Sequence, residues 1–561
     1  MRLFSLFWDR ISSDQWIRDA VRGYKIEFKR EPIQYTLPNK MPFSREEKEC
    51  ISVEVGKLLG KGAIRRASFD PKQFLSNVFT IPKKGGEPRP VINLKPLNHF
   101  VEYHHFKMEG LNSILDLIRP NDYMITMDLK DAYLSVPIHA DHSKYLRFEW
   151  ESDLWEFTCL PFGLSSAPRV FTKVMKPVIG RVRSQGIRSV IYLDDMAVLS
   201  RSIDQSNLDS QFVIETLQSV GFLINWEKSV LKPCKRIQFL GFTIDSSSMT
   251  VSLPQEKLNK LIERASATLH HPKRSIREVA EVIGLIVSSF PAIKLARLHY
   301  RHLEFSKVNA LKENLNDFDA ACSLSQEAKD ELEWFSTRCY LYNGTSIKKH
   351  SSVMVLTTDA SLSGWGVTFE NQSTNGEWSM LEKKHYINWL ELQTVLLGLQ
   401  SFLSSSCGGN VIKVFCDNST AVAYVNNMGG KIVSLNCIAY SIWELCLSFD
   451  CSIEAFHVPG VQNVCADRLS RKHESSLEWK LHPTVFKWIA EHYFAPDIDL
   501  FASRLNYQVG RYVSWKPDPG AWAVDAFSVV WSCLKPYLFP PFSLLGKVLQ
   551  KLKIGRASCR E

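Results

Sequence analysis

The sequence predicts a multidomain protein that combines α+β and α/β domains in one chain. At about 150 residues per domain, the 561 residues suggest three or four domains. The composition, with 45% hydrophobic and 23% charged residues, is that of ordinary globular proteins and excludes a mainly disordered or collagen-like chain. Short β-rich runs alternate with helical patterns over most of the sequence, which indicates the mixed class.

Charge and cysteine content limit the partners and the compartment. The 68 Lys and Arg residues exceed the 59 Asp and Glu residues, a mild excess that permits a nucleic-acid partner without demonstrating one. The 13 cysteines form no CxxC pair, so we expect no zinc knuckle and reduced thiols inside the cell, in the cytoplasm and/or the nucleus. The apolar runs are too short for a secretion signal or a membrane span, so no membrane partner is expected.

Composition and periodicity divide the chain into six segments. A helix is predicted to begin at Ser44-Arg-Glu-Glu47 and to continue to Leu59. Further on, Pro272 should end one helix, and Ser275-Ile-Arg-Glu278 is a capping box that opens the next. The expected segments are a lead-in with little core of its own (1–43), an α+β domain (44–253), a helical block (254–350), a second mixed domain (351–472), a segment rich in Pro and aromatic residues (473–553) and a tail (554–561).

The first group of acidic residues lies in the α+β domain. Asp128 ends a short apolar strand, and Asp194 and Asp195 interrupt the apolar run Val190–Leu199 at the tip of a predicted hairpin. Neighbouring carboxylates repel one another unless a cation lies between them. Two Mg²⁺ ions held there would suit phosphoryl transfer, because they can activate the attacking oxygen and stabilise the leaving one. The alternative is an ordinary polar turn, since Asp favours turns in general.

Four blocks flank these acids. Ile81–Asn98 is a basic hairpin leading into a strand, suited to gripping a triphosphate, and Leu160–Pro168 is a tight turn before a helix. Gly221–Ser229 is followed by Phe239–Phe242. In this order and spacing the set resembles the reverse transcriptases over about residues 63–253. The resemblance implies a right-hand fold of fingers, palm and thumb, with a β-α-β-β-α-β palm.

The resemblance also implies roles for single residues. Asp128, Asp194 and Asp195 would be catalytic palm carboxylates around two Mg²⁺ ions, with Mn²⁺ as an alternative ion. Tyr133 would lie under the sugar of the dNTP and exclude a 2′-hydroxyl, although an ordinary core tyrosine is the alternative. The residues expected to contact the dNTP are Lys83, Lys84, Arg89, Tyr133 and Gly163. The residues expected to form the primer-grip turn are Phe239, Leu240 and Gly241.

The helical block would then form the thumb and the connection. Its basic residues could follow a phosphate backbone. A solvated helix face explains them equally well and is slightly favoured. These residues are Lys257, Lys260, Arg264, Lys273, Arg274 and Arg277.

The second group of acids lies in the second mixed domain. Asp359 and Asp417 each end an apolar strand, Glu391 lies near the start of a helix, and Asp467 lies in a helix opened at Asn463. The Glu391 helix should bury a stripe at spacings of three and four. Its members are Trp389, Leu392, Leu396, Leu399 and Leu403. Several acids delivered to one end of a sheet are costly unless metal is bound.

This pattern resembles the ribonuclease H fold, with all four family acids at their expected places. The resemblance implies that Asp359, Glu391, Asp417 and Asp467 hold two Mg²⁺ ions and cut the RNA of an RNA–DNA hybrid. The alternative for any single acid is an N-cap or a surface charge. We expect His457 to be a strand-end residue and leave it out of the catalytic set.

The segment 473–553 contains a third set of motifs. Asp497–Ser503, Val524–Phe527 and Leu538–Phe542 are spaced like the motifs of phage-type adenine methyltransferases, in which Asp499 would lie in the cofactor loop. Phe539 stands where that family has Asn or Asp, which removes the polar group that would hold the adenine amine. An inactive or structural role is therefore expected.

The order of these domains resembles the polyprotein of DIRS-type retrotransposons, as does the stretch from Leu97-Asn98 to His105–Glu109. We therefore expect an RNA-directed DNA polymerase with ribonuclease H activity. Its partners would be an RNA template, a DNA primer, the RNA–DNA hybrid and dNTPs, with little sequence preference and marked salt sensitivity. The oligomeric state is not predicted.

Two alternatives stay open: a non-catalytic nucleic-acid-binding relic of such an element, and a ribonuclease H with a decayed polymerase. The chain is expected to be truncated at both ends. Its last eight residues, 554–561, resemble a translated sequencing adapter.

Overall fold

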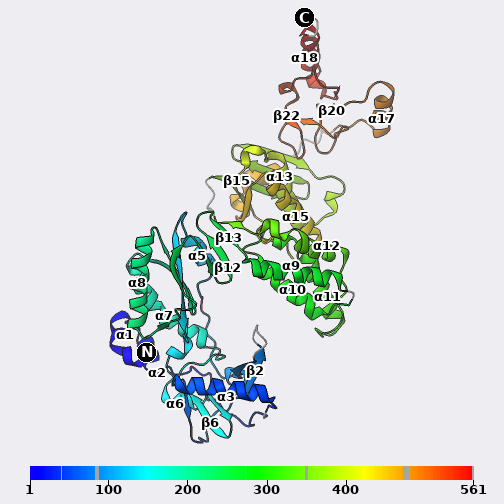
Figure 1. Cartoon of the computed structure of the whole chain (residues 1–561). Coiled ribbons are helices and arrows are strands. Elements are labelled where there is room, and N and C mark those ends of the chain that lie inside the picture. Colours follow the sequence, from blue (N-terminus) through cyan, green and yellow to red (C-terminus); the bar gives the residue numbers. More distant parts are fainter. Residues whose placement is uncertain (40, 83–87, 272, 348–351, 472–478, 559–561) are drawn as a thin grey trace. The chain divides into compact units, whose positions relative to one another are not determined.

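The computed structural model describes residues 1–39, 41–82, 88–271, 273–347, 352–471 and 479–558 (Figure 1). Of residues 82, 88–89 and 554–558 it describes the backbone alone. The chain divides into two compact units, one comprising Met1–Gln255 with Gly344–Ile347, and the other comprising Glu256–Asn343 with Lys348–Glu561. None of the helices in the described ranges is long and apolar enough to cross a membrane.

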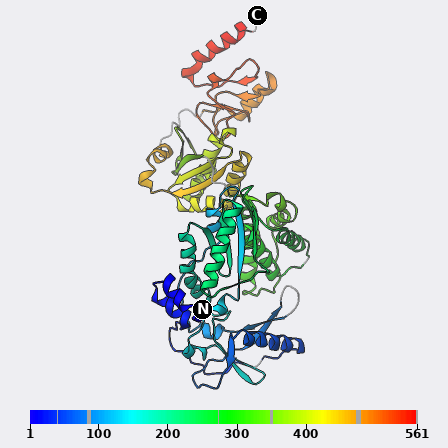
Figure 2. The ribbon, with the colours of Figure 1, turned by 60° about the vertical axis from the view of Figure 1, so that its left-hand side comes forward.

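A five-stranded antiparallel sheet forms the centre of the first unit. Four of its strands follow the order β10-β4-β8-β7, and β9 also pairs with β4. The strands are β4 (Tyr123–Lys130), β7 (Arg188–Tyr192), β8 (Asp195–Ser200), β9 (Leu223–Ile224) and β10 (Val230–Cys234). Helices α7 (Ala167–Ser184) and α8 (Ile203–Ser219) pack on β7 and β8 and on each other (Figure 1, Figure 2). This arrangement is the α+β pattern that the sequence predicts.

The two faces of this sheet have different neighbours because successive side chains of a strand alternate between faces. Ile125, Met127 and Leu129 of β4 belong to the large core that contains residues of α7 and α8. Met124 points to the other face, into a second core shared with α5 and the strands β11–β13. Asp128 has the same parity as Met124, so it lies on the face away from α7 and α8.

The remaining elements of the first unit surround this sheet. Their bounds are α1 (Ser5–Ile11), α2 (Gln15–Gly23), α3 (Arg45–Gly60), β1 (Ile64–Arg66), β2 (Val78–Pro82), β3 (Pro88–Ile92), α4 (Lys95–Asn98), α5 (Leu111–Leu117), α6 (Ala140–Ser143), β5 (Arg147–Trp150) and β6 (Asp153–Phe157). The predicted start of α3 is confirmed, because Ser44 and Glu47 form a reciprocal capping box.

The opening residues pack into the large core of the unit. Trp8 is fully buried and its Nε1 donates a hydrogen bond to the carbonyl oxygen of Val220 at 3.1 Å. Tyr24 is also buried in this core. The segment expected as a lead-in is thus built into the first unit.

A small antiparallel sheet completes the first unit. It has the order β11-β12-β13-β14, with strands β11 (Arg236–Phe239), β12 (Phe242–Asp245), β13 (Thr250–Ser252) and β14 (Thr345–Ser346). The turn between β11 and β12 is Leu240-Gly241, and both residues have positive φ, 49° and 79°. Two positive φ angles are typical of the tight turns that match the twist of a hairpin.

The second unit opens with helices α9 (Gln255–His270), α10 (Ile276–Ser289), α11 (Arg301–Glu313) and α12 (Gln326–Thr337). The predicted capping box of α10 is confirmed. The amide of Ser275 donates to Glu278 Oε2 at 2.7 Å, and the amide of Glu278 donates to Ser275 Oγ at 3.3 Å. Pro272, expected to end the preceding helix, lies outside the described residues.

A mixed five-stranded sheet follows, with the order β17-β16-β15-β18-β19. β15 is antiparallel to β16 and parallel to β18, and β18 is parallel to β19. The elements are β15 (Val353–Ala360), β16 (Gly364–Phe369), β17 (Gln372–Glu377), α13 (Ile387–Phe402), β18 (Val411–Cys416), α14 (Ser419–Asn426), α15 (Val433–Ser448), β19 (Ser452–His457) and α16 (Val464–Arg471).

The predicted stripe of α13 is wrong in extent. The helix packs on β15 and β16 on one side and on α14 and α15 on the other, so Leu390, Val395 and Leu397 are buried as well. Leu403 follows the helix as its C-cap. A single stripe is expected only where one side of a helix faces solvent.

The last described segment has a small core of its own. Its elements are α17 (Pro483–His492), β20 (Ile498–Asp499), β21 (Val513–Ser514), β22 (Ala523–Val524), β23 (Pro536–Tyr537) and α18 (Leu545–Ser558). β20 pairs with β23 and β21 with β22, both in parallel. Of the tail expected at 554–561, the residues to Ser558 continue α18, and the rest lies outside the described residues.

Two candidate acidic sites

The first site is built by the hairpin of β7 and β8 beside β4. The register of β4 and β8 places Asp128 directly opposite Asp195. Opposed residues of this kind have Cβ atoms about 4.5–5.5 Å apart. The turn Leu193-Asp194 joins β7 to β8, with Leu193 at a φ of 54°, and the amide of Leu129 donates to the carbonyl oxygen of Asp194 at 2.9 Å. The three acids predicted from sequence therefore lie together.

Asp128 is held by residues that the sequence analysis did not single out. Asn225 Nδ2 donates to Asp128 Oδ1 at 2.8 Å, and the amide of Asp128 donates to Ser229 Oγ at 3.0 Å. The amide of Asn225 also donates to the carbonyl oxygen of Asp128 at 2.8 Å. The signal was present, because both polar residues lie in the Gly221–Ser229 block, just after the apolar strand β9.

Charge repulsion marks this site. Burial raises the pKa of Asp195, the charges of Asp194 and Asp128 raise it further, and Lys228 partly offsets them. Burial together with the Asp194 charge raises the pKa of Tyr133 to about 12. The Tyr133 hydroxyl is thus neutral at physiological pH. A bound cation would stabilise the ionised forms of the three acids.

A cavity of about 750 Å³ opens beside the acids. Asp128 and Asp194 line it together with Lys61, Lys228 and Phe162. Strand β3 contributes Pro90, Val91 and Ile92 to its wall. The ring of Tyr133 lies 5.0 Å from that of Phe162 and 5.5 Å from that of Phe171.

The structure describes only some of the residues predicted to contact a dNTP. Lys83 and Lys84 lie outside the described residues, and Arg89 is described as a backbone position of β3 opposite Ile81. Gly163 is exposed and has a φ of 95°. Asn98 fixes its turn, donating from Nδ2 to the carbonyl oxygen of Gly163 at 2.9 Å and accepting at Oδ1 from the amide of Ser165 at 2.9 Å.

The five-stranded sheet that contains β4, β7 and β8 is called the palm sheet below. The turn predicted as the primer grip lies on the face of this sheet that carries Asp128. Phe239 is buried in the core that also contains Met124 of β4. Leu240 and Gly241 form the tight turn that follows it. The sequence pattern therefore identified a real hairpin turn.

The second site lies at the carboxyl ends of the parallel strands. The register pairs Thr358 with Cys416 and Cys416 with His457. Asp359 near the end of β15 and Asp417 directly after β18 therefore lie at the same end of the sheet. His457 is the last residue of β19, as predicted.

Helix α13 brings Glu391 to this end of the sheet. Ligand atoms of Glu391, Cys416 and Asp417 lie within 4.8 Å of one another. Burial raises the pKa of Glu391 to about 9, and the charges of Asp359 and Asp417 add to the shift. Burial likewise raises the pKa of Asp359 to about 6, with further contributions from Asp417 and Asp467. Asp359, Glu391 and Asp417 therefore form a cluster of acids whose negative charges are not balanced by positive charges of nearby described residues.

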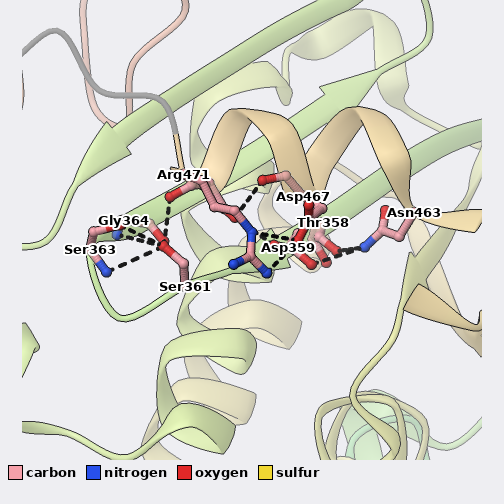
Figure 3. Close-up of polar contacts among 9 residues, drawn as sticks. Thr358, Asp359, Ser361, Ser363, Gly364, Asn463, Asp467 and Arg471 are labelled. Carbon is pink, nitrogen blue, oxygen red and sulfur yellow. Dashed lines mark hydrogen bonds and ion pairs between the residues drawn. The ribbon is translucent and has the colours of Figure 1, made fainter. Parts of the chain in front are cut away.

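Helix α16 and Asn463, the residue before it, supply the groups that hold Asp359 (Figure 3). Ser470 Oγ donates to Asp359 Oδ2 at 2.6 Å, and Asn463 Nδ2 donates to Asp359 Oδ1 at 3.3 Å. Asp467 lies on the same helix, and its Oδ1 accepts from Arg471 Nε at 2.8 Å and from Arg471 Nη2 at 2.7 Å. Asp359, Glu391 and Asp417 are thus grouped, and Asp467 is paired with Arg471.

The sequence analysis missed three polar residues of this site. Cys416 Sγ lies 3.7 Å from Glu391 Oε2 and is the strand residue before Asp417. Asn463 and Ser470 are buried on either side of Asp467. Asn463 directly precedes α16, and Ser470 lies three residues after Asp467 on the same helix face. The spacing of Asp467 and Ser470 is the signal that could have revealed Ser470.

The other candidates have structural partners. Asp499 is 2% exposed and accepts from the amides of Phe501 at 3.3 Å and Gln508 at 3.1 Å. In the helical block, Arg277 Nε donates to Asp319 Oδ1 at 2.8 Å, and Arg274 Nη2 donates to the carbonyl oxygen of His271 at 2.6 Å. The other basic residues named in that block are exposed.

Residues 81–244 match the protein family described as reverse transcriptase (RNA-dependent DNA polymerase). The chain is 23% identical over 472 residues to an enzymatic polyprotein of Cassava vein mosaic virus, covering 81% of this chain and 69% of that one. It is 22% identical over 349 residues to the transposon Tf2-3 polyprotein of Schizosaccharomyces pombe, covering 55% of this chain and 25% of that one. The chain therefore contains a reverse transcriptase domain of the kind found in viral and retroelement polyproteins.

Solved structures of a foamy viral protease-reverse transcriptase share the fold. The complex of that protein with dsDNA has a TM-score of 0.52 at 16% identity, covering 82% of this chain and 97% of the viral chain. Its complex with an RNA/DNA hybrid has a TM-score of 0.50 at 15% identity, covering 86% and 65%. The predicted fold class, a right-hand polymerase followed by a ribonuclease H-like mixed-sheet domain, is confirmed.

Proposed function

We propose that this chain is an RNA-directed DNA polymerase with ribonuclease H activity, encoded by a retrotransposon of the DIRS type. One observation supports the polymerase above all others. Asp128 and Asp195 are opposed in register, with Asp194 at the adjoining turn, and Asp128 and Asp194 line one large cavity. This arrangement suits an enzyme that must hold cations against phosphates.

The donor set of the first site fits Mg²⁺, with Mn²⁺ as an alternative. Asp128, Asp194 and Asp195 offer carboxylate oxygens, which are the hard ligands that these ions prefer. Burial first, and then the charges of Asp194 and Asp128, raise the pKa of Asp195, and bound cations would relieve the repulsion among the three acids. Two such ions, when bound, would supply charge stabilisation to the phosphoryl group in transfer. Asn225 would keep Asp128 oriented toward them.

The reaction would be attack of the primer 3′-hydroxyl on the α-phosphate of a dNTP, with pyrophosphate leaving. Lys228 lines the cavity and would attract the phosphates. Lys83, Lys84 and Arg89 would add to this attraction, as the resemblance of the sequence implies. Tyr133, packed between Phe162 and Phe171, would present a fixed ring to the sugar and exclude a 2′-hydroxyl by contact. The bare backbone at Gly163 would lie against the base pair.

The template and primer would be held mainly through their backbones. The turn Phe239, Leu240 and Gly241 would support the primer end. Recognition of this kind implies little sequence preference and marked salt sensitivity, and the exposure of Lys257 and Lys260 agrees with a solvated helix face as well as with a phosphate contact.

The second site would cut the RNA strand of the RNA–DNA product. Asp359, Glu391, Asp417 and Asp467 would bind two Mg²⁺ ions, and the buried, mutually repelling carboxylates fit this role. When bound, the ions would polarise the scissile phosphate. Ser470 and Asn463 would fix Asp359, and Arg471 would release Asp467 to the ions.

We assign a structural role to the segment after residue 478. The carboxylate of Asp499, the expected cofactor-loop residue, accepts hydrogen bonds from two backbone amides. Arg504 Nη1 donates to Glu382 Oε1 at 2.8 Å, and Arg504 Nη2 donates to the carbonyl oxygen of Glu377 at 3.0 Å. Both acceptors belong to or follow β17, the edge strand of the mixed sheet, so the segment would brace that edge.

The origin and the compartment are part of the proposal. The DIRS type is supported by the order of the domains and by the block His105–Glu109. An intracellular setting, the cytoplasm and/or the nucleus, agrees with described cysteines that form no disulfide bond.

Primer extension on an RNA template with Mg²⁺ tests the polymerase. We expect dNTP incorporation by the wild-type chain and a loss of about a hundredfold or more in Asp194→Asn, because one charge-stabilising group is removed. Asp131→Asn is the matched control. Asp131 lines the same cavity but pairs with Lys61 at 2.9 Å, so this variant should stay within about threefold of wild type.

Equal activity in Asp194→Asn and the wild type would reject the assigned site. No incorporation by a folded wild-type chain would instead favour the relic, or a ribonuclease H with a decayed polymerase. A hybrid-cleavage assay then separates these two. Cleavage that Asp417→Asn abolishes and the exposed Glu454→Gln control preserves supports the ribonuclease H.

A further inference from the structure

Strand β7 is the edge of the palm sheet and leads directly into the turn that carries Asp194. Among the described strands it pairs with β8 alone. In an antiparallel pair, every second residue of an edge strand directs its N–H and C=O away from the sheet. On β7 these outward groups include the carbonyl of Ser189 and the amide of Ile191, which bond to side chains rather than to β8.

Two oppositely charged side chains occupy this edge. Glu109 Oε2 accepts from the amide of Ile191 at 2.9 Å, and Arg183 Nη2 donates to the carbonyl oxygen of Ser189 at 2.7 Å. Arg183 Nη2 also donates to both carboxylate oxygens of Glu109, at 2.6 and 2.8 Å. The pair offers β7 one acceptor and one donor, as the backbone of a neighbouring strand would.

The outward side of β7 borders a cavity, and the ion pair of Glu109 and Arg183 bonds to its backbone there. Glu109, Arg183, Ile191 and Leu193 all line a cavity of about 500 Å³, so this flank of the hairpin borders open volume. The two side chains come from firm supports: Arg183 lies in the last turn of α7, and Glu109 directly precedes Gly110, the N-cap of α5. The opposite flank is held by the β8–β4 ladder.

We infer that Glu109 and Arg183 are positioning residues that replace a missing strand and fix the hairpin bearing Asp194 and Asp195. The inference rests on the proposed polymerase function. Neither residue would touch the substrate. Their effect would come through the backbone of Ile191, which sets the place of the acidic turn, and a displacement of about 1 Å can cost about a hundredfold in rate.

The first test is the kinetics of the full chain with Glu109→Ala. We expect kcat for primer extension to fall about tenfold or more, with KM for the dNTP unchanged within about twofold. The thermal midpoint should fall by only about 2–4 °C, because Glu109 and Arg183 are partly exposed and water can reach the Ile191 amide once the carboxylate is removed. Arg181→Gln is the control from the same turn of α7, where Arg181 lies over the rings of Phe7 and Phe212. A kcat within twofold of wild type in Glu109→Ala would overturn the inference.

A charge swap separates backbone support from a simple ion pair. The double variant Glu109→Arg with Arg183→Glu can rebuild the ion pair, but it places a donor against the Ile191 amide and an acceptor against the Ser189 carbonyl. We expect its activity to stay as low as that of Glu109→Ala. Recovery to the wild-type rate would show that β7 needs only the ion pair and would refute the inference.

Hydrogen–deuterium exchange of the hairpin gives a readout that does not depend on polymerisation. Peptides covering residues 188–195 should exchange faster in Glu109→Ala than in the wild type or in Arg181→Gln, because the Ile191 amide loses its acceptor. Unchanged exchange would contradict the inference. If the wild-type chain extends no primer, the proposed function fails, and this measurement still decides whether the pair supports the strand.

Discussion

Glu391 is a carboxylate only 4% exposed, and the raised pKa of about 9 follows from burial and from two neighbouring acids. Its side chain is enclosed by the fold, with Cys416 Sγ 3.7 Å from its Oε2. Such a residue destabilises the folded chain whenever it must ionise without a cation.

The raised pKa predicts how stability depends on pH in the absence of divalent ions. At neutral pH the folded chain keeps the proton on Glu391 and the unfolded chain loses it, so the folded state binds more protons. Its stability should therefore fall as pH rises from the ordinary value of 4.5 toward about 9. Asp359, with a pKa of about 6, acts in the same direction at the lower end of this range.

Glu391→Gln removes the penalty. In excess chelator we expect the thermal midpoint of this variant to exceed that of wild type by about 2 °C or more near pH 8, and to match it near pH 5. The measurement is thermal unfolding at the two pH values, with the exposed Glu454→Gln as control. An equal midpoint near pH 8 would mean that Glu391 is not the strained acid described here.

At the scale of elements, the contact between α16 and β16 sets the position of Asp467 and Ser470. A Cβ atom at Gly366 would lie 2.5 Å from the carbonyl oxygen of Ala466 and 2.6 Å from the amide nitrogen of Ser470. Both are backbone atoms of α16, which cannot yield as a flexible side chain would. Helix and strand approach this closely only because residue 366 has no side chain.

Gly366→Ala should therefore shift α16 and weaken the bond from Ser470 to Asp359. We expect RNA–DNA hybrid cleavage to fall about a hundredfold, with primer extension within about twofold of wild type. Gly284→Ala is the control, because a Cβ at that position of α10 meets no heavy atom within 4 Å. Full cleavage by a folded Gly366→Ala variant would show that α16 tolerates the displacement.

Element types were largely predictable where local rules determine them. Capping boxes at Ser44 and Ser275 indicate the starts of two helices. The acids at Asp194–Asp195 and Asp359 come after strongly apolar runs of sequence. The failures have a different cause. The burial of α13 on two sides depends on α15, a helix distant in sequence, and the roles of Cys416 and Glu109 depend on which strands become neighbours. Pairings of that kind are tertiary and leave little local trace.

At the scale of the whole molecule, each acidic site is built within a single unit. Asp128, Asp194 and Asp195 belong to the unit of the palm sheet, and Asp359, Glu391, Asp417 and Asp467 belong to the unit of the mixed sheet. Each unit has a hydrophobic core built from its own residues, so we expect polar substitutions at the two sites to act independently.

The two proposed activities should therefore separate cleanly. Asp194→Asn is expected to cleave hybrids at the wild-type rate, and Asp417→Asn to extend primers at the wild-type rate, each within about threefold. Both activities are measured on the same preparation with the same hybrid substrate. Joint loss in either folded variant would show that the sites are coupled.

Strand β14 has a consequence for any attempt to dissect the chain. Its two residues, Thr345 and Ser346, pair with Val251 and Thr250 of β13, although the chain has by then passed through four helices of the other unit. The polypeptide thus leaves the first unit, returns and leaves again. In a fragment that ends at Gln255, β13 would keep its pairing with β12 but lose β14, and its exposed edge could pair with another chain. Joining Gly344–Ile347 to the end of such a fragment through a short linker would restore β14 at the edge of β13.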